Sequence, residues 1–351
     1  MRNLAILTVR NEAAFLLDWL AHHKAVGFTD FLIFSNDCDD GTDDILDRLQ
    51  ELGHVTHLRN DGPYDKGGIQ FTALKIAAKH DLVKQADWIL PLDIDEFVNI
   101  HTGDGTLDAL RAALPDATAI TLTWRLFGNA DQVRFVDAPI PQTFTHCAPT
   151  IMHWPWRASM FKTFYANDDT YRKPGVHRPR DSDETRLPNA RWFDGEGREL
   201  DAKFKTKRLF SPFGRSNYAL VQLNHYALGA MESYVLKADR GRAVHSDHLL
   251  GLDYWTERNW NTDEDKTIHR YAPQTSEIKT KFLNDSRLHR LHEQAVQWRK
   301  DRFDILMEKE PFRALFARLM MASPARPISA KAARFMVSYA NKARRNAKQK
   351  T

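Results

Sequence analysis

A regular alternation of strand-like and helix-like segments in the first third of the chain limits the folds that are open to it. Apolar runs predict strands at Leu4–Val9, Phe31–Phe34, His54–Leu58 and Trp88–Asp93. The intervening pattern predicts helices at Glu12–Val26, Asp43–Leu52 and Gly68–Leu82. Thr42 is the expected N-cap of the second helix. Because strands that alternate with helices form right-handed βαβ units, we expect an α/β fold with a parallel sheet.

Four polar segments follow the predicted strands directly, namely Thr8–Glu12, Ser35–Asp40, Asn60–Lys66 and Asp93–Glu96. The carboxyl ends of parallel strands meet at one edge of a sheet, where ligands bind, so we expect these segments to form one rim. No G-x-G-x-x-G follows the first strand, and no G-x-x-x-x-G-K-[ST] occurs. Both absences disfavour a dinucleotide-dependent enzyme and a P-loop protein.

The segment Asp93-Ile94-Asp95 carries the strongest chemical signal. Side chains alternate along a strand, so the two aspartates point the same way and repel each other. A divalent cation relieves that repulsion, and carboxylate oxygens suit Mg²⁺ or Mn²⁺. Such an ion can offset the charge of a departing nucleotide diphosphate. Taken alone, these three residues are also compatible with an ordinary acidic loop that follows a strand.

Composition narrows the class of protein. A chain of 351 residues with 42% hydrophobic content predicts one large domain or two modest ones. Cys38 and Cys147 are too few for a disulfide framework, which favours a reducing compartment. Neither a signal peptide nor an apolar run of about 18 residues is recognised, so we expect a cytoplasmic protein without a membrane span.

The net charge of +4 is unevenly distributed. Ten Lys and Arg residues and no Asp or Glu follow Glu310, which leaves 40 basic and 46 acidic residues in the rest of the chain. The basicity therefore belongs to the C-terminal tail. A general nucleic-acid-binding function is disfavoured.

Several motifs together resemble those of family 2-type glycosyltransferases, in the subgroup related to family 92. The likeness covers roughly residues 1–245. The matching segments are Thr8-Val9-Arg10-Asn11-Glu12 with Trp19 and His23, Ser35-Asn36-Asp37, Ala86–Phe97, Trp124–Gly128, Asn224-His225-Tyr226 and Lys237–Gly241.

The resemblance implies a GT-A fold, in which a Rossmann-like, mostly parallel sheet is flanked by helices. We expect a domain at 1–260, divided into a nucleotide-sugar half (1–128) and an acceptor half (129–260). Residues 261–351 would form a helical extension with a basic tail. The implied activity is inverting hexosyl transfer from a nucleotide-sugar, expected to be a UDP-sugar, to a glycan or lipid-linked hydroxyl in cell-surface polysaccharide synthesis.

The resemblance also implies roles for individual residues. The expected ligands of Mn²⁺ or Mg²⁺ are Asp93, Asp95 and His225. The expected donor-binding residues are Arg10, Asn11, Glu12, Asp37, Asp39, Lys66, Asp93, Lys237 and Arg240. Simpler explanations stay open. Glu12 could be a charge that the helix dipole favours, and Asp37 and Asp39 could form Asx turns. His225 could be a structural histidine, and Lys237 and Arg240 could belong to a solvated basic face.

An inverting reaction needs a carboxylate near the acceptor hydroxyl. The expected acceptor region, 150–215, is rich in aromatic residues, which can stack on sugars but also mark any core. It contains the base candidates Asp181, Asp183 and Glu184, together with Asp194 and Glu196. The sequence does not choose among them.

The C-terminal region predicts two amphipathic basic helices, around Phe312–Leu319 and Ala330–Ala343. Such segments can lie on an anionic membrane, so we expect peripheral attachment to its inner face. A solvated docking tail is the alternative.

The chain departs from the family pattern in three places, of which the first two affect the expected substrate, and the third is that residues beyond about 260 match no recognised pattern. Pro91 lies inside the fourth predicted strand, which suggests an edge strand or a bulge. Gly229-Ala230 stands where the family pattern has a basic residue and a serine, which keeps an inactive nucleotide-sugar-binding protein in view. A nucleotidyltransferase shares the sheet and the carboxylate pair, but Leu4–Glu12 contains no glycine.

Overall fold

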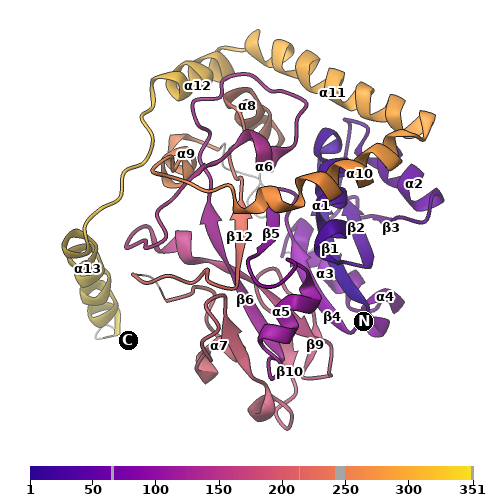
Figure 1. The fold of residues 1–351 in the computed structure, drawn as a ribbon. Coiled ribbons are helices and arrows are strands. Elements are labelled where there is room, and N and C mark those ends of the chain that lie inside the picture. The colour runs from indigo at the N-terminus through magenta and orange to yellow at the C-terminus, as the bar shows by residue number, and fades with distance from the viewer. Residues whose placement is uncertain (65–66, 213, 242–249, 349–351) are drawn as a thin grey trace.

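The computed structural model describes residues 1–64, 67–212, 214–241 and 250–348 (Figure 1). In this part of the chain the centre is a nine-stranded mixed sheet. Its spatial order is β3 (Thr56–Arg59), β2 (Asp30–Ser35), β1 (Asn3–Val9), β4 (Trp88–Leu92), β8 (Phe161–Ala166), β6 (Ala119–Leu126), β12 (Val221–His225) and β5 (Glu96–Ile100), with β11 (Trp192–Asp194) beside β6. Only β8 and β5 run antiparallel to their neighbours in this sheet. The predicted mostly parallel α/β sheet is confirmed.

The predicted βαβ alternation of the N-terminal half is also confirmed. Its helices are α1 (Ala13–Val26), α2 (Thr42–Glu51), α3 (Ile69–Ala77) and α4 (Asp81–Gln85). One difference is that the expected helix at Gly68–Leu82 is divided, because the side chain of His80 caps a new helix by accepting from the Leu82 amide. The expected Thr42 cap is wrong: Gly41 holds the N-cap position with φ of 87°, and the Thr42 hydroxyl donates to Asp40 instead.

The parallel half of the sheet is buried on both faces, as its continuous apolar strands require. Along β1, Ala5, Leu7 and Val9 lie in the core that contains α1. Leu4 and Ile6 point the other way, into a second core that contains residues of α3. Helices on both faces therefore hold the C-terminal ends of β1, β2 and β4 in one fixed edge.

Pro91 does not make β4 an edge strand, contrary to expectation. β4 lies between β1 and β8, and Pro91 is opposite Ile6 of β1. The antiparallel ladder with β8 includes only Trp88 and Ile89. Since that ladder ends before Pro91, the missing proline N–H breaks no pairing with β8.

Shorter elements complete the second half. The helices are α5 (Leu107–Ala113), α6 (Ile140–Thr143), α7 (Ala202–Thr206), α8 (Met231–Arg240) and α9 (Leu252–Arg258). Two small sheets pair β9 (Tyr171–Lys173) with β10 (Arg180–Ser182), and β7 (His146–Cys147) with β13 (Asp263–Glu264).

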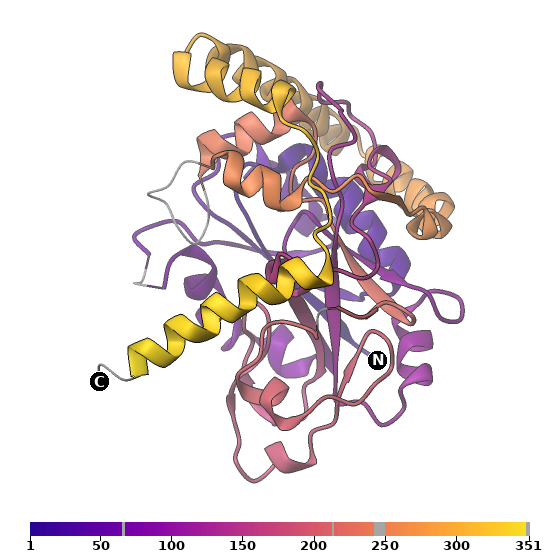
Figure 2. The ribbon, with the colours of Figure 1, turned by 90° about the vertical axis from the view of Figure 1, so that its left-hand side faces the viewer.

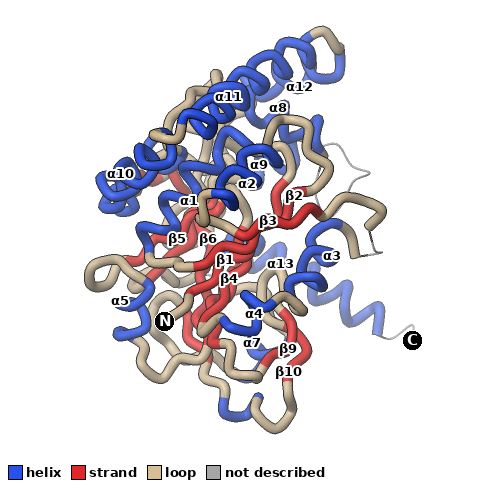
Figure 3. The backbone as a smooth tube through the Cα atoms, turned by 90° about the vertical axis from the view of Figure 1, so that its right-hand side faces the viewer, coloured by secondary structure: helices blue, strands red, loops and turns tan. Residues whose placement is uncertain are grey.

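The predicted helical C-terminal extension is confirmed. Its helices are α10 (Ala272–Leu283), α11 (Ser286–Met307), α12 (Glu310–Met321) and α13 (Ala330–Lys348). Figure 3 shows α10 and α11 beside α1 and α2, and Lys279 of α10 pairs with Asp18 of α1 at 2.7 Å. Phe282 and Leu288 join the core that contains α1, so the apolar core continues past the expected boundary at residue 260. None of the helices within the described ranges combines the length and apolarity that a membrane span needs.

Candidate active site

A cleft of about 370 Å³ lies at the carboxyl ends of β1, β2 and β4. It is lined on the sheet side by Thr8, Val9, Arg10, Asn36, Asp93 and Asp95, and on the other side by residues of α8 and α9. The Asn36 amide donates to the Val9 carbonyl at 2.8 Å, and Asn36 accepts from Asn60 at 2.6 Å. The loops after three strands are thus tied together, which confirms the predicted rim.

Asp93 is held by protein groups on both oxygens. Gln70 donates to Oδ1 at 2.8 Å, and Lys162 Nζ donates to Oδ2 at 2.9 Å. Lys162 is only 1% exposed and lies 3.5 Å from Glu96, which is fully buried. Burial raises the pKa of Glu96 to about 8, although Lys162 opposes that shift. One buried cation therefore lies between two carboxyl groups under the Asp-x-Asp motif.

Asp95 faces the cleft and pairs with two groups from the second half of the chain. Lys237 of α8 donates to Oδ2 at 2.7 Å, and His225 Nε2 lies 3.6 Å from Oδ1. Burial alone would raise the pKa of Asp95, but Lys237 and His225 hold that pKa well below its usual value. Burial lowers the pKa of His225, so its imidazole is neutral near pH 7. Asp95 is consequently an anion with one cationic and one neutral neighbour.

These residues fit a divalent metal only if the substrate helps to bind it. Among the described residues, no group of three or more His, Cys, Asp and Glu could hold an ion. Mg²⁺ sites in enzymes of phosphate chemistry often use one or two carboxylates and complete the shell with phosphate oxygens and water. The anionic Asp95 and the neutral His225 have the right chemistry for this. Asp93 is less available, because both of its oxygens are already hydrogen-bonded.

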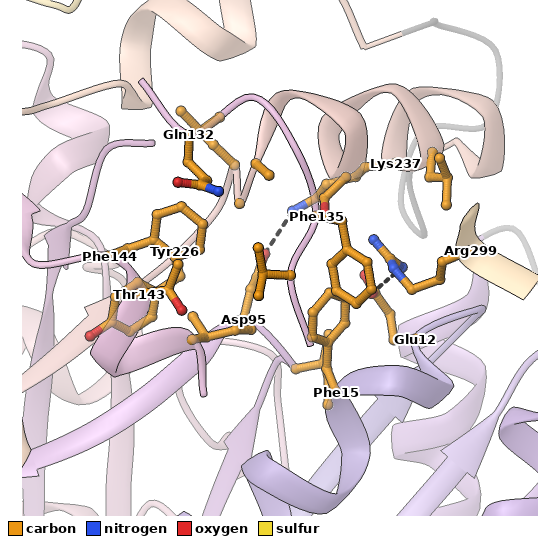
Figure 4. Close-up of a pocket in the computed structure, with 18 of the residues that line it drawn as sticks. Glu12, Phe15, Asp95, Gln132, Phe135, Thr143, Phe144, Tyr226, Lys237 and Arg299 are labelled. Carbon is orange, nitrogen blue, oxygen red and sulfur yellow. Dashed lines mark hydrogen bonds and ion pairs between the residues drawn. The ribbon is translucent and has the colours of Figure 1, made fainter. Parts of the chain in front are cut away.

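A second pocket, of about 70 Å³, lies beside the cleft and shares Asp95, Lys237 and Arg240 with it. Figure 4 shows Asp95 next to Lys237, and Glu12 next to Arg299. Glu12 forms ion pairs with Arg240 of α8 and, at 3.7 Å, with Arg299 of α11. The C-terminal extension thus reaches the second pocket through Arg299, whose guanidinium also packs on the rings of Phe15 and Phe135.

The other expected donor-binding residues form a hydrogen-bonded rim. The Asn11 amide donates to Asp39, whose own amide donates back to Asn11 Oδ1 at 2.9 Å. Asp37 accepts from the Tyr64 hydroxyl and the Gly62 amide. Asn11 and Asp37 both have positive φ, 50° and 46°, so these loops are held in specific turns. The expected residue Lys66 lies outside the described residues.

The base candidates lie apart from the cleft. Asp181 pairs with Lys173 at 2.9 Å, Asp183 pairs with Arg172 at 3.2 Å, and Glu184 is exposed. Hydrogen bonds from Thr185 are the main reason that the pKa of Asp183 falls to about 2, which makes it a weak base. None of the three is among the residues that line the cleft in the described chain. The β9–β10 connection nevertheless brings Val176 and His177 into the cleft wall.

Sequence reasoning missed several residues that line the cleft or support Asp93 from beneath it. Lys162 and Gln70 carry no motif, and only their place in the fold brings them to Asp93. Tyr254 and Arg258 line the cleft from α9, where Arg258 stacks on the Tyr254 ring at 3.7 Å. The aromatic residues expected to stack on an acceptor are mostly core residues, including Phe161, Phe164, Tyr165 and Trp192.

Comparisons with known proteins agree with the geometry. Residues 6–187 match the family model of glycosyltransferase family 92. A glycosyltransferase family 92 protein of Oryza sativa subsp. japonica is 27% identical over 106 residues, which are 29% of this chain and 17% of the rice protein. One of Ricinus communis is 28% identical over 102 residues, or 28% of this chain and 16% of that protein. The chain spans about a sixth of the length of these curated relatives.

Solved structures offer a weaker likeness. S. aureus TarS 1-349 in complex with UDP-GlcNAc is 16% identical, with 81% of this chain and 72% of that chain covered and a TM-score of 0.33. S. aureus TarS 1-349 is 15% identical, with 87% of this chain and 83% of that chain covered and a TM-score of 0.31. A likeness at this level supports no statement about donor or acceptor.

Proposed function

This chain belongs to glycosyltransferase family 92, and on that premise we propose that it transfers a hexose from a UDP-sugar to a hydroxyl of a glycan or lipid-linked acceptor. The transfer is metal-dependent, inverts the anomeric carbon and serves the synthesis of a cell-surface polysaccharide. One observation supports this proposal above the others. The carboxylate of Asp95 opens into the cleft with Lys237 and His225 beside it, where a nucleotide diphosphate would need cations.

The donor would bind across the ends of β1, β2 and β4. Asn11, Asp37 and Asp39 present amide and carboxylate oxygens at this rim, which suit the polar edges of a uracil and a ribose. Arg10 lines the cleft, and its buried Nε has no hydrogen-bond partner among the described residues. A diphosphate placed near it would supply the missing acceptor.

The two cations of α8 are already paired with carboxylates in this structure. Lys237 binds Asp95, and Arg240 binds Glu12. A bound Mn²⁺ or Mg²⁺ would neutralise the developing charge of the leaving diphosphate. Asp95 and His225 would hold such an ion, and Lys237 and Arg240 would donate to the oxygens of the leaving diphosphate and so stabilise the charge that forms on it.

Inversion requires a base beside the acceptor hydroxyl. The carboxylates lining the described cleft are Asp93 and Asp95, and both are paired with lysines. Asp181, Asp183 and Glu184 would serve only if the β9–β10 hairpin moved toward the cleft. Asp181→Asn and Glu184→Gln test this directly, since loss of the true base lowers kcat by about 100-fold or more and leaves donor binding intact.

The test is the release of UDP from a panel of UDP-sugars, with Mn²⁺ or with EDTA, by the wild type, Asp95→Asn and Lys84→Met. Lys84 is an exposed surface lysine paired with Asp81, so its variant controls for substitution as such. We expect metal-dependent release that Asp95→Asn abolishes and Lys84→Met retains. Equal release by Asp95→Asn, with its fold verified by circular dichroism, would overturn the proposal.

Two other results would replace it. Tight UDP binding without turnover of any donor, even with acceptor glycans present, would indicate an inactive nucleotide-sugar-binding protein. Release of pyrophosphate from UTP and a sugar 1-phosphate would indicate a nucleotidyltransferase. Preference for GDP- or TDP-sugars would keep the transferase and change only the donor.

A further inference from the structure

We propose that helix α13 docks the protein on an anionic lipid surface. The helix lies at the periphery of the molecule and is joined to α12 by the extended segment 322–329 (Figures 1 and 2). That segment is anchored, because the Ala325 amide donates to the Asn259 carbonyl at 2.8 Å. The helix therefore starts from a fixed point on the body.

An exposed apolar edge runs along α13. Phe335, Met336 and Tyr339 are 60%, 46% and 57% exposed. At about 100° per residue they fall within an arc of about 100°. Phe335 and Tyr339 also contact each other edge to face, with ring centroids 5.0 Å apart. Three large apolar side chains in one arc form a surface that water solvates poorly.

This edge is not the side on which the helix packs. Ala333 is 3% exposed and lies about 160° around the helix from Phe335. Val337 and Ala340, on the same side as Ala333, are half-buried. The packing of α13 thus leaves the Phe335 edge directed away from the buried side.

The charge of the helix selects the partner. Between residues 330 and 348 there are six Lys and Arg residues and no acidic residue. Lys331 and Lys342 lie within about 40° of Phe335, which suits side chains that insert apolar stems and keep their charge at the headgroups. Apolar insertion flanked by cations is the pattern of an interfacial helix on anionic lipid. A soluble acidic partner would use the cations and leave the apolar edge exposed to water.

The experiment is co-sedimentation of the full chain with vesicles of phosphatidylcholine, alone or mixed equally with phosphatidylglycerol. One variant carries Phe335→Ser, Met336→Ser and Tyr339→Ser, and a second carries Lys331→Glu and Lys342→Glu. The matched control is Met320→Ser with Met321→Ser, which removes two exposed apolar side chains from α12 instead. Circular dichroism and thermal melts verify that each variant is folded.

We expect the wild type and the control to bind the mixed vesicles and not the neutral ones. The affinity of each α13 variant for the mixed vesicles should fall by at least about tenfold. One cation near the surface contributes about fivefold to the affinity, and the apolar insertion contributes comparably. Absence of wild-type binding would overturn the proposal. Wild-type-like binding by the triple serine variant would also overturn it, since contact would then be through charge alone.

Discussion

Lys162→Met tests the claim that one buried lysine holds the Asp-x-Asp motif together. The substitution keeps the length of the side chain and removes the cation that lies 2.9 Å from Asp93 and 3.5 Å from Glu96. Removing one partner of a buried ion pair costs about 3–5 kcal/mol. An unfolding entropy of about 2.1 cal/mol/K per residue gives about 0.7 kcal/mol/K for a chain of this length, so Tm should fall by about 4–7 °C.

Differential scanning calorimetry near pH 7 measures the effect. Adding Asp93→Asn to Lys162→Met removes the carboxylate that has lost its cation, so the double variant should show a coupling of about 1–3 kcal/mol relative to the two single variants. Lys84→Met, at an exposed pair, should change stability by less than about 0.5 kcal/mol. A Tm for Lys162→Met within about 1 °C of the wild type, or an additive double variant, would refute the reasoning.

Three further predictions concern stability and the contact between the extension and the cleft. Burial lowers the pKa of His22 to about 4; the unfolded chain therefore takes up the proton first, and stability falls by up to about 3 kcal/mol as pH drops from about 6.5 to 4. His22→Gln should flatten this part of a Tm–pH curve, whereas His289→Gln, at an exposed site, should not. Gly128→Ala should lower Tm by several degrees in a thermal melt, because a Cβ there would lie 2.5 Å from a backbone oxygen, while Gly251→Ala, where a Cβ would meet no described atom within 4 Å, should not. Arg299→Ala should weaken UDP binding by severalfold in calorimetry, and unchanged affinity would show that the extension does not shape the cleft.

Much of the N-terminal half could be predicted from the sequence. Its strands are continuous apolar runs with helices between them, and local pattern decides both. Right-handed crossovers then bring Asn36, Asn60 and Asp95 to the same edge without any further information. Local capping was harder, because residue type favours Thr42, and only the folded loop shows that Gly41 holds the N-cap position while Asp40 accepts from the Ala13 amide.

The residues from distant segments that hold Asp93 and Glu12 could not be predicted in the same way. Lys162 reads as an ordinary strand residue, and its burial depends on the antiparallel pairing of β8 with β6. Arg299 lies in the long polar helix α11, and nothing in its local sequence indicates that it meets Glu12. The base candidates failed to reach the cleft for a related reason: a segment rich in carboxylates does not indicate which of them a hairpin directs outward.

The central claim is that Asp95 and a divalent metal together hold a nucleotide diphosphate in the cleft. Isothermal titration of UDP into the wild type and Asp95→Asn, with Mn²⁺ and with EDTA, tests it most directly. The account predicts UDP binding to the wild type only in Mn²⁺, and loss of that binding in the folded variant. Equal affinity in EDTA, or retention of metal-dependent binding by Asp95→Asn, would contradict it.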